Sequence, residues 1–340
     1  MELRKDPITR SWVLNGDSEP SQLVCQPCPY CPGNESLTGP PIYSLSLDSR
    51  EPIRVFPHPR PLYTIEGRAE LRAEGLYDKM RPVGAHEVII ENSDHNARLS
   101  FAEEADISRL LRCWAVRIDD LKNDIRFKYI TVFKNQGSVA GQEVKHPHSE
   151  LTATPFIPRR ILYELRSSQE YFQRKERCVI CDIERQEEQQ GVRVVDISGN
   201  YLAICPFASR VPYELWIIPR YHESSFEADL LRRGEAMELA GILRRCLARL
   251  EQLTDSYHLV LHTSPNTKSR REIPGYWSTI EDDYHWHIEI LPIAQKQTKS
   301  YSIKETYFCP TSPETAAARL KNLPASREVL PQRHLEFQPT

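Results

Sequence analysis

The sequence predicts an α+β fold made of two similar halves, each an antiparallel sheet with a long helix packed against it. Two observations support this prediction. The same order of β-rich run, amphipathic stretch, strand and His-x-His-x-Glu segment occurs twice, and each half begins with a Cys-x-x-Cys pair. The spacing also repeats, since eight residues separate Glu87 from His95 and Glu214 from His222. We therefore expect an internal duplication into residues 1–165 and 166–340, with the junction near 160–175.

The elements follow in the same order in each half. The β-rich runs 86–91 and 213–218 are expected strands. Each precedes an amphipathic stretch: residues 100–124 open with Ser100 and Glu103 in a capping-box pattern, and residues 227–253 carry leucines at the spacing of one long helix. Strands are then expected at 129–135 and 257–263. Near the end, residues 306–322 are expected to finish in a short helix that starts near Pro313.

Composition limits the class of protein. The chain has 340 residues, 40% of them apolar, which is enough for a sizeable core in two domain-sized units. A formal net charge of −3 argues against general nucleic-acid binding, which needs a basic surface. No apolar run approaches the roughly 20 residues needed to cross a bilayer, and the first residues lack the apolar core of a signal peptide. We expect a cytoplasmic protein without a membrane partner.

Close-spaced cysteines and distant histidines predict two metal centres. Nine cysteines do not form an obvious disulfide framework, and Cys-x-x-Cys pairs in a reducing compartment favour metal or redox chemistry. Zinc takes four Cys and His ligands in a tetrahedron. We expect two zinc ions per chain, the first held by Cys28, Cys31, His95 and His146, the second by Cys178, Cys181, His222 and His285. Cys25 is an alternative to Cys28 or Cys31.

Other interpretations of these residues are less specific. A Cys-x-x-Cys pair is also compatible with a redox pair or with two buried thiols. For any single histidine the alternative is a hydrogen-bonded core or surface residue, and this is the preferred interpretation for His258, His262 and His334.

The two His-x-His-x-Glu segments place their polar residues on one face of a strand, because alternate strand residues point the same way. His146, His148 and Glu150 share one side, and so do His285, His287 and Glu289. Around the second segment, Trp286, Ile288 and Ile290 form the opposite face of an expected half-buried strand. Pro147 cannot donate to a sheet, so the first segment is expected at a sheet edge or at the end of a strand.

His148 is the predicted nucleophile. If the first histidine of a pair binds metal, the second is held beside it, and a neutral imidazole can attack phosphorus to form a covalent intermediate. The stretch before His148 contains Gly137 and Gly141, which permit a loop whose backbone amides face a phosphate. No comparable loop precedes His287, so the second pair is expected to be structural. The competing interpretation is that neither histidine is catalytic.

The ordered set "DPITRSWVL", "CPYCPGNE", "GAHEVIIENSDH", "FKNQGSVAG", "HPHSELTATPF" and "HWHIEI" resembles the galactose-1-phosphate uridylyltransferase family of the histidine triad superfamily. The resemblance covers nearly the whole chain. It implies two histidine-triad-like halves, a homodimer, and ping-pong transfer of a nucleoside monophosphate from a nucleotide sugar, through His148, to a sugar 1-phosphate or phosphate.

The resemblance also implies site residues and metals. The Cys-x-x-Cys pair of the second half resembles the two-zinc ADP-sugar phosphorylase-like branch, whereas bacterial uridylyltransferases bind iron there, so iron is the alternative metal at the second site. Lys134 and Gly137 are expected near the substrate phosphates. Nucleotide contacts are implied for Phe56, His58, Val88, Asn135 and Gly141.

Several positions depart from the family pattern. Glu150 replaces a glutamine, Glu143 a serine and His58 an asparagine, and residues 15–22 replace an arginine-rich segment. A carboxylate about 4 Å from a phosphate charge would cost on the order of 4 kcal/mol at an effective dielectric of 20. Glu150 would escape this cost if it were protonated, if Lys134 or Lys145 neutralised it, or if it acted as a general acid or base.

The predicted function is therefore nucleotidyl transfer through His148, with Glu150 as a second catalytic residue and a sugar 1-phosphate as acceptor. Two alternatives remain open: a nucleotide-sugar phosphorylase or hydrolase, and a zinc-stabilised nucleotide-binding protein whose catalysis the acidic substitutions have weakened.

Overall fold

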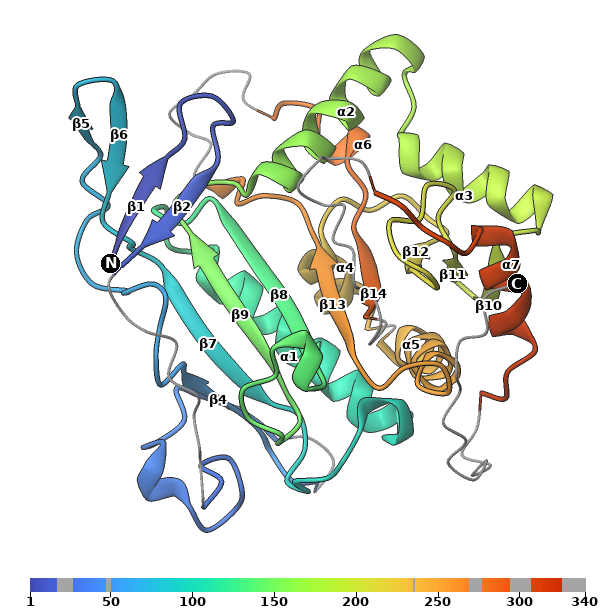
Figure 1. The fold of residues 1–340 in the computed structure, drawn as a ribbon, viewed down its shortest axis with the longest axis horizontal. Coiled ribbons are helices and arrows are strands. Elements are labelled where there is room, and N and C mark those ends of the chain that lie inside the picture. The colour runs from blue at the N-terminus through green and yellow to red at the C-terminus, as the bar shows by residue number, and fades with distance from the viewer. Residues whose placement is uncertain (17–26, 47–49, 235, 269–276, 294–306, 326–340) are drawn as a thin grey trace.

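A continuous antiparallel sheet of ten strands forms the centre of the molecule (Figure 1). The computed structural model describes residues 1–16, 27–46, 50–234, 236–268, 277–293 and 307–325. From one edge to the other, the strands are β10 (Val194–Ser198), β11 (Tyr201–Ile204), β12 (Leu215–Pro219), β14 (His287–Pro292), β13 (Tyr257–His262), β8 (Tyr129–Gln136), β9 (His148–Thr154), β7 (Ala85–Ile90), β4 (Ile53–Pro57) and β3 (Tyr43–Leu45).

The strand order is symmetric about the middle of this sheet. Outward from the centre, β8-β9-β7-β4-β3 on one side matches β13-β14-β12-β11-β10 on the other. The central strands β8 and β13 pair antiparallel, with Asn135 opposite His258. Both halves are thus copies of one five-stranded pattern, and the predicted α+β class with duplicated antiparallel halves is confirmed.

Helices on one face of the sheet cover both halves. The main apolar core lies between the sheet and α1 (Glu104–Leu121), α4 (Phe226–Arg233), α5 (Ala236–Leu250) and α7 (Pro313–Lys321). The helix expected near Pro313 is confirmed: it starts at Pro313, and the Ser312 side chain accepts a hydrogen bond from the backbone N–H of Thr315. Removing apolar surface from water on this face is the main force that stabilises the sheet.

The opposite face is covered unequally. Over the second half lie α2 (Arg159–Lys175), α3 (Val179–Gln190) and the short α6 (Ile280–Asp283), with their own apolar clusters (Figure 1). Over the first half, the described segments contribute a loop with the 3-10 turn η1 (Glu35–Leu37) and a small apolar cluster around Tyr30 and Phe56, but no α-helix. Among the described residues, α-helices therefore cover this face of the second half only.

Short elements complete the fold. A second sheet with the order β2 (Trp12–Asn15), β1 (Glu2–Lys5), β6 (Tyr77–Met80) and β5 (Arg72–Glu74) lies at one end of the molecule (Figure 1). Two further 3-10 turns are η2 (Leu99–Phe101) and η3 (Ser138–Ala140). The predicted junction at 160–175 falls within α2.

Two helix predictions need correction. Ser100 does not cap α1: its hydroxyl donates to the Glu251 carboxylate at 2.7 Å, and Glu103 occupies the N-cap without a side-chain hydrogen bond. The expected single helix over 227–253 is two helices, because α4 ends at Gly234, whose φ of +70° is a left-handed C-cap conformation.

Two strand predictions also change. Pro147 immediately precedes β9, as expected for a strand end, but β9 lies between β8 and β7 and is therefore not at an edge. The strand expected to be half-buried, β14, is buried on both faces, because α2 covers the side that carries His287 and Glu289.

Candidate active site and metal centres

Four predicted ligands of the first half converge on one point. The Nδ1 atoms of His95 and His146 lie 3.4 Å and 3.6 Å from Cys31 Sγ, and His146 Nδ1 lies 3.8 Å from Cys28 Sγ. A tetrahedral zinc ion with Zn–S of about 2.3 Å and Zn–N of about 2.05 Å places sulfur and nitrogen about 3.6 Å apart. The four side chains therefore fit zinc in both donor type and spacing.

Backbone groups orient these ligands. His146 Nε2–H donates to the carbonyl oxygen of Asn92 at 2.7 Å, which leaves Nδ1 to face the sulfurs. The Asn34 side chain donates to the carbonyl oxygen of Cys28 at 2.8 Å and closes the cysteine turn. Cys25, the alternative ligand, lies outside the described residues.

The second half repeats the arrangement. Cys181 Sγ lies 3.3 Å from His222 Nδ1 and 3.4 Å from His285 Nδ1, and Cys178 completes a set whose ligand atoms all lie within 4.8 Å of one another. His222 Nε2–H donates to the carbonyl oxygen of Glu281 at 2.8 Å. All eight predicted metal ligands thus gather into two groups of four, each suited to one zinc ion.

His148 is the first residue of β9, directly beyond the first metal centre. Its Nδ1–H donates to the carbonyl oxygen of His146 at 2.7 Å, so the lone pair of the neutral ring lies on Nε2. Burial lowers the pKa of His148 below its ordinary value, which favours this neutral form. The next residue, Ser149, points to the opposite face, where its hydroxyl accepts a hydrogen bond from Trp114 at 2.9 Å. The ring is therefore held with an unprotonated nitrogen toward the site face.

Glu150 lies beside His148, and its two carboxylate oxygens have different surroundings. Oε1 is 3.9 Å from His148 Nε2, whereas Oε2 is 2.9 Å from His86 Nε2 and 4.0 Å from His58 Nε2. Although burial favours the neutral acid, the hydrogen bond from His86 and the nearby imidazoles lower the pKa of Glu150 below its usual value. Without a bound substrate, these contacts therefore favour the ionised form of Glu150 over the protonated form.

His86 is a site residue that the sequence analysis did not single out. It stacks on His58 with ring centroids 4.0 Å apart and planes 3° from parallel. The sequence feature that could have identified His86 was its position at the start of a predicted strand. There it shares one face with Val88 and Ile90, because alternate strand residues point the same way. Nothing local in the sequence indicated that this strand pairs with β9.

One row of side chains crosses three neighbouring strands: Phe56 in β4, Val88 in β7 and Glu150 in β9. Val88 lies directly opposite Phe56 on one side and Glu150 on the other. Phe56 and Val88 are buried against Tyr30. Asn135 lies on the same face, and its side-chain oxygen is 2.7 Å from His258 Nδ1. The structure thus brings the predicted nucleotide contacts Phe56, His58, Val88 and Asn135 onto the face that carries His148.

Lys134 does not lie on this face. Its neighbours in β8, Phe133 and Asn135, point toward the site, so Lys134 points into the core, where it is fully buried and bonds to Glu91 at 2.8 Å and to the carbonyl oxygen of His148 at 3.1 Å. Its predicted contact with substrate and its predicted neutralisation of Glu150 are therefore wrong. Lys134 instead supports the backbone of His148.

The glycine loop differs from the expected phosphate cradle. The backbone N–H of Gly137 donates to the side-chain oxygen of Gln142 at 2.8 Å, and that of Gly141 donates to the carbonyl oxygen of Ser138 at 3.1 Å. Both glycines have positive φ, and a Cβ on Gly137 would lie 2.3 Å from Ser256 Oγ. The glycines shape a tight turn at the end of β8, but their amides bond within the loop.

Glu143, another departure from the family pattern, has its own counter-ion. Its carboxylate is 2.5 Å from the Arg60 guanidinium, which comes from the segment after β4. This pair limits the repulsion that Glu143 would exert on a phosphate.

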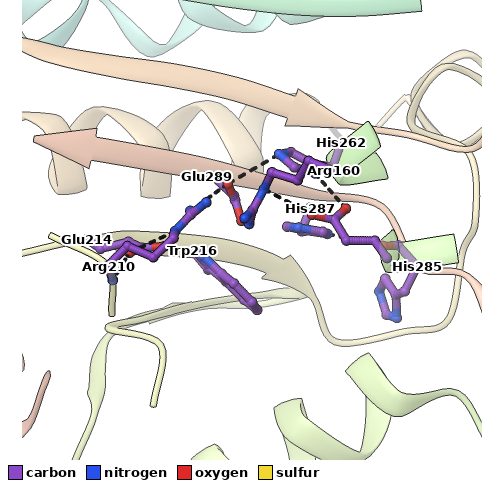
Figure 2. Close-up of polar contacts among 9 residues, drawn as sticks. Arg160, Arg210, Glu214, Trp216, His262, His285, His287 and Glu289 are labelled. Carbon is purple, nitrogen blue, oxygen red and sulfur yellow. Dashed lines mark hydrogen bonds and ion pairs between the residues drawn. The ribbon is translucent and has the colours of Figure 1, made fainter. Parts of the chain in front are cut away.

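The equivalent position in the second half is closed. Val88 is opposite Glu150 and Trp216 is opposite Glu289, so strand pairing matches His86 with Glu214, one position away from the match that the spacing suggested. Arg210 bridges Glu214 and Glu289, with a distance of 2.7 Å to Glu289 Oε2 (Figure 2). In the second half an arginine therefore pairs with the glutamate, whereas in the first half neutral imidazoles contact the equivalent glutamate.

Further charged side chains lie around His287. Arg160 from α2 contacts Glu289 Oε1 at 2.7 Å, and His262 lies between Glu164 and Glu289 at 2.8 Å and 3.3 Å (Figure 2). Burial lowers the pKa of His287 to about 4. His262 is a buried, hydrogen-bonded residue, as predicted for this histidine. His334 lies outside the described residues.

A hollow of about 540 Å³ lies beyond the carboxyl end of β9, away from His148. Its lining contains none of the predicted site residues and consists of Lys5, Arg10, Trp12, Lys128, Phe156, Ile157, Leu162, Arg166, Gln169 and Trp277.

A symmetric ten-stranded sheet, two Cys₂His₂ clusters and a His-x-His segment beside each cluster define a duplicated α+β protein with two candidate metal centres. The family model for the galactose-1-phosphate uridyl transferase N-terminal domain matches residues 10–158. The chain is therefore similar to the galactose-1-phosphate uridylyltransferase family.

Similar proteins include an ADP-glucose phosphorylase and a galactose-1-phosphate uridylyltransferase. ADP-glucose phosphorylase of Arabidopsis thaliana is 29% identical, over 86% of this chain and 84% of the relative, and galactose-1-phosphate uridylyltransferase of Thermotoga maritima is 28% identical, over 94% and 98%. The crystal structure of the Arabidopsis thaliana ADP-glucose phosphorylase with bound ADP-glucose is similar, with a TM-score of 0.75 at 27% identity, covering 95% of this chain and 100% of that one.

Within the described residues, every helix is too short or too polar to traverse a bilayer.

Proposed function

We propose that the protein is a nucleotidyltransferase that takes a nucleoside monophosphate from a nucleotide sugar and carries it covalently on His148. The observation that carries this proposal is the hydrogen bond of 2.7 Å from His148 Nδ1 to the carbonyl oxygen of His146, which leaves the Nε2 lone pair on the site face. The named activities of the relatives support the same class of reaction.

The chemistry follows from this geometry. Nε2 attacks the α-phosphorus, an N–P bond forms, and the sugar 1-phosphate leaves with the electrons of the broken P–O bond. This leaving group is a phosphate monoester whose second pKa is near 6, so it needs no proton to depart. Phe56, Val88 and Asn135 would lie along the nucleotide.

We assign a supporting role to the metals. Two zinc ions would be held by the two Cys₂His₂ clusters, and the first would fix His146, whose carbonyl oxygen orients the nucleophile. Zinc there supplies rigidity rather than a reacting group. From the resemblance to this family we also propose a cytoplasmic homodimer that binds a nucleotide sugar and a sugar phosphate.

Two acceptors are suggested by the relatives. A sugar 1-phosphate acceptor would make the protein a hexose-1-phosphate uridylyltransferase-like enzyme, whereas the similarity to an ADP-glucose phosphorylase favours inorganic phosphate. The alternative of a weakened, nucleotide-binding protein is favoured by Glu143, by Glu150 and by the missing arginine-rich segment. Arg60 pairs with Glu143, and the imidazoles at Oε2 reduce the objection from Glu150.

The test is covalent labelling. The zinc-loaded protein is mixed with UDP-glucose or ADP-glucose labelled in the α-phosphate, and protein-bound label that is acid-labile and base-stable is measured. We expect label on the parent and none on His148→Gly. His287→Gln, a matched change in the sealed second half, should keep the label. Label on folded His148→Gly, or none on the parent despite binding of the nucleotide sugar, would refute the proposal.

A further inference from the structure

The two carboxylate oxygens of Glu150 have different surroundings. Among the described residues, Oε1 accepts no hydrogen bond and faces His148 Nε2 at 3.9 Å, while Oε2 is directed at two imidazoles.

Backbone amides set the protonation of those imidazoles. The N–H of Leu62 donates to His86 Nδ1 at 3.2 Å, and the N–H of Arg60 donates to His58 Nδ1 at 3.1 Å. A nitrogen that accepts a hydrogen bond carries no proton, so both rings are neutral tautomers with the proton on Nε2. Two stacked rings therefore present N–H groups toward Oε2. They hold the carboxylate in its ionised form without supplying a full positive charge.

The second half shows what a purely structural glutamate looks like at this position. Both oxygens of Glu289 contact guanidinium groups, Oε1 with Arg160 and Oε2 with Arg210, each at 2.7 Å (Figure 2). Such a carboxylate has no oxygen left to accept a proton. Glu150 differs by keeping Oε1 available beside the reacting nitrogen.

We propose that Glu150 is the general base of the second half-reaction, held by His86 and His58 as positioning residues, and that the acceptor is a neutral hydroxyl, either water or an alcohol, rather than a phosphate anion. This inference rests on the proposed function, because it concerns the fate of the nucleotide on His148.

Each candidate acceptor makes a different demand on the site. A phosphate or sugar 1-phosphate arrives already ionised, so a base has no proton to remove from it. A hydroxyl must lose its proton as it attacks. An oxygen hydrogen-bonded to Oε1 lies within reach of a phosphorus carried on Nε2, since Oε1 is only 3.9 Å from that nitrogen.

The step balances as follows. The hydroxyl oxygen bonds to phosphorus while its proton passes to Glu150 Oε1, and the P–N bond breaks with its electron pair returning to His148 Nε2. With water the product is the free nucleoside monophosphate, and with an alcohol it is a nucleoside monophosphate ester. The proton on Glu150 is then released to solvent, since the side chain retains 16% exposure.

The experiment follows the discharge of the labelled protein. Isolated parent protein carrying the nucleotidyl label is chased in buffer alone, with glycerol, with inorganic phosphate, or with glucose 1-phosphate. We expect buffer to release the nucleoside monophosphate, glycerol to divert part of the label into an ester, and neither phosphate compound to accelerate discharge. Glu150→Gln should still take up label but discharge it to water about 10²- to 10⁴-fold more slowly.

Two further variants separate base catalysis from charge and from architecture. Glu143→Gln removes a nearby negative charge that is paired with Arg60, and it should change discharge far less than Glu150→Gln. His86→Ala should slow discharge without altering the concentration of nucleotide sugar that half-saturates labelling, and His86→Gln, which keeps an N–H donor, should recover part of the rate.

The outcomes are distinct. If the parent label persists in buffer and phosphate or glucose 1-phosphate discharges it as fast in Glu150→Gln as in the parent, the base assignment is wrong while the proposed function stands. If the parent takes up no label at all, both are wrong.

Discussion

Arg210 is expected to be one of the most important side chains for stability in the second half, and Arg210→Met tests this. The guanidinium contacts Glu214 at 2.6 Å and Glu289 at 2.7 Å, and the side chains of both glutamates are about 1–2% exposed (Figure 2). Methionine preserves much of the volume but leaves two buried carboxylates with one counter-ion fewer.

The magnitude follows from burial. Each charge pair at about 4 Å between charge centres is worth about 4 kcal/mol at an effective dielectric of 20, and the desolvation of Arg210 opposes part of this gain. Breaking a buried pair by removing one partner costs about 3–5 kcal/mol. Arg160 and His262 still neutralise Glu289, so we expect about 3 kcal/mol.

Urea unfolding of the zinc-loaded protein measures this loss, and Arg4→Met is the matched control. Arg4 pairs with Glu2 on the surface with 63% of its side chain exposed, so its loss should cost less than about 1 kcal/mol. If Arg210→Met lowers the free energy of unfolding by less than about 1 kcal/mol, and the dependence of this free energy on urea concentration is unchanged, the ion pairs around Glu289 in Figure 2 contribute little to stability.

The same variant has a predictable pH dependence. Burial favours protonated Glu289, but His262, Arg210 and Arg160 hold the pKa of this carboxyl well below its usual value. Such a group stabilises the parent above the unfolded pKa of about 4.3, and this contribution is lost as the pH falls toward the folded pKa. The difference between parent and Arg210→Met should therefore shrink below pH 4.3, because protonation removes the orphaned charge from the variant.

Three more predictions concern the metals, the loop and a buried histidine. Elemental analysis should find two zinc ions per chain in the parent and one in His222→Ala, whereas two in that variant would contradict the ligand set. Gly137→Ala should lower the free energy of unfolding by more than about 1 kcal/mol, since its Cβ would meet Ser256 Oγ at 2.3 Å, while Gly191→Ala, with positive φ but open space, should lose only about 1 kcal/mol. Despite burial, Glu164 and Glu289 raise the pKa of His262 to about 9, so its stabilisation is complete below pH 6.5 and lost as the pH rises through 9. His262→Gln should flatten the fall in stability between those values, and an unchanged fall would refute this assignment.

Sequence patterns predicted the parts of this protein whose signals are local. Cys-x-x-Cys turns, alternation in the strands and the repeated spacing indicated both metal clusters and the duplicated sheet, because each depends on residues a few positions apart. The helix break at Gly234 and the buried role of Ser100 were missed because a partner distant in sequence, or a single backbone torsion, decided them.

The candidate active site shows the same dependence on contacts between residues distant in sequence. His148 was identified because its neighbour His146 belongs to a recognisable ligand set. Lys134 was placed wrongly because its distance along the chain from His148 says nothing about which face of β8 it occupies. His86 was missed because its contact with Glu150 depends on the register between β7 and β9, 64 residues apart in the chain.

By itself, the sequence determined the class of fold, the two candidate sets of metal ligands and the strand that carries the candidate nucleophile, since short-range periodicity and ligand chemistry specify each of these. Only the tertiary structure decided how the two equivalent glutamates are paired. Both halves have a His-x-His-x-Glu strand, but α2 crosses the second and places Arg160 on Glu289, while Glu150 meets two neutral imidazoles and keeps one oxygen beside His148. The physical reason is that the charge state and accessibility of a carboxylate depend on what packs against it, and those neighbours come from distant parts of the chain.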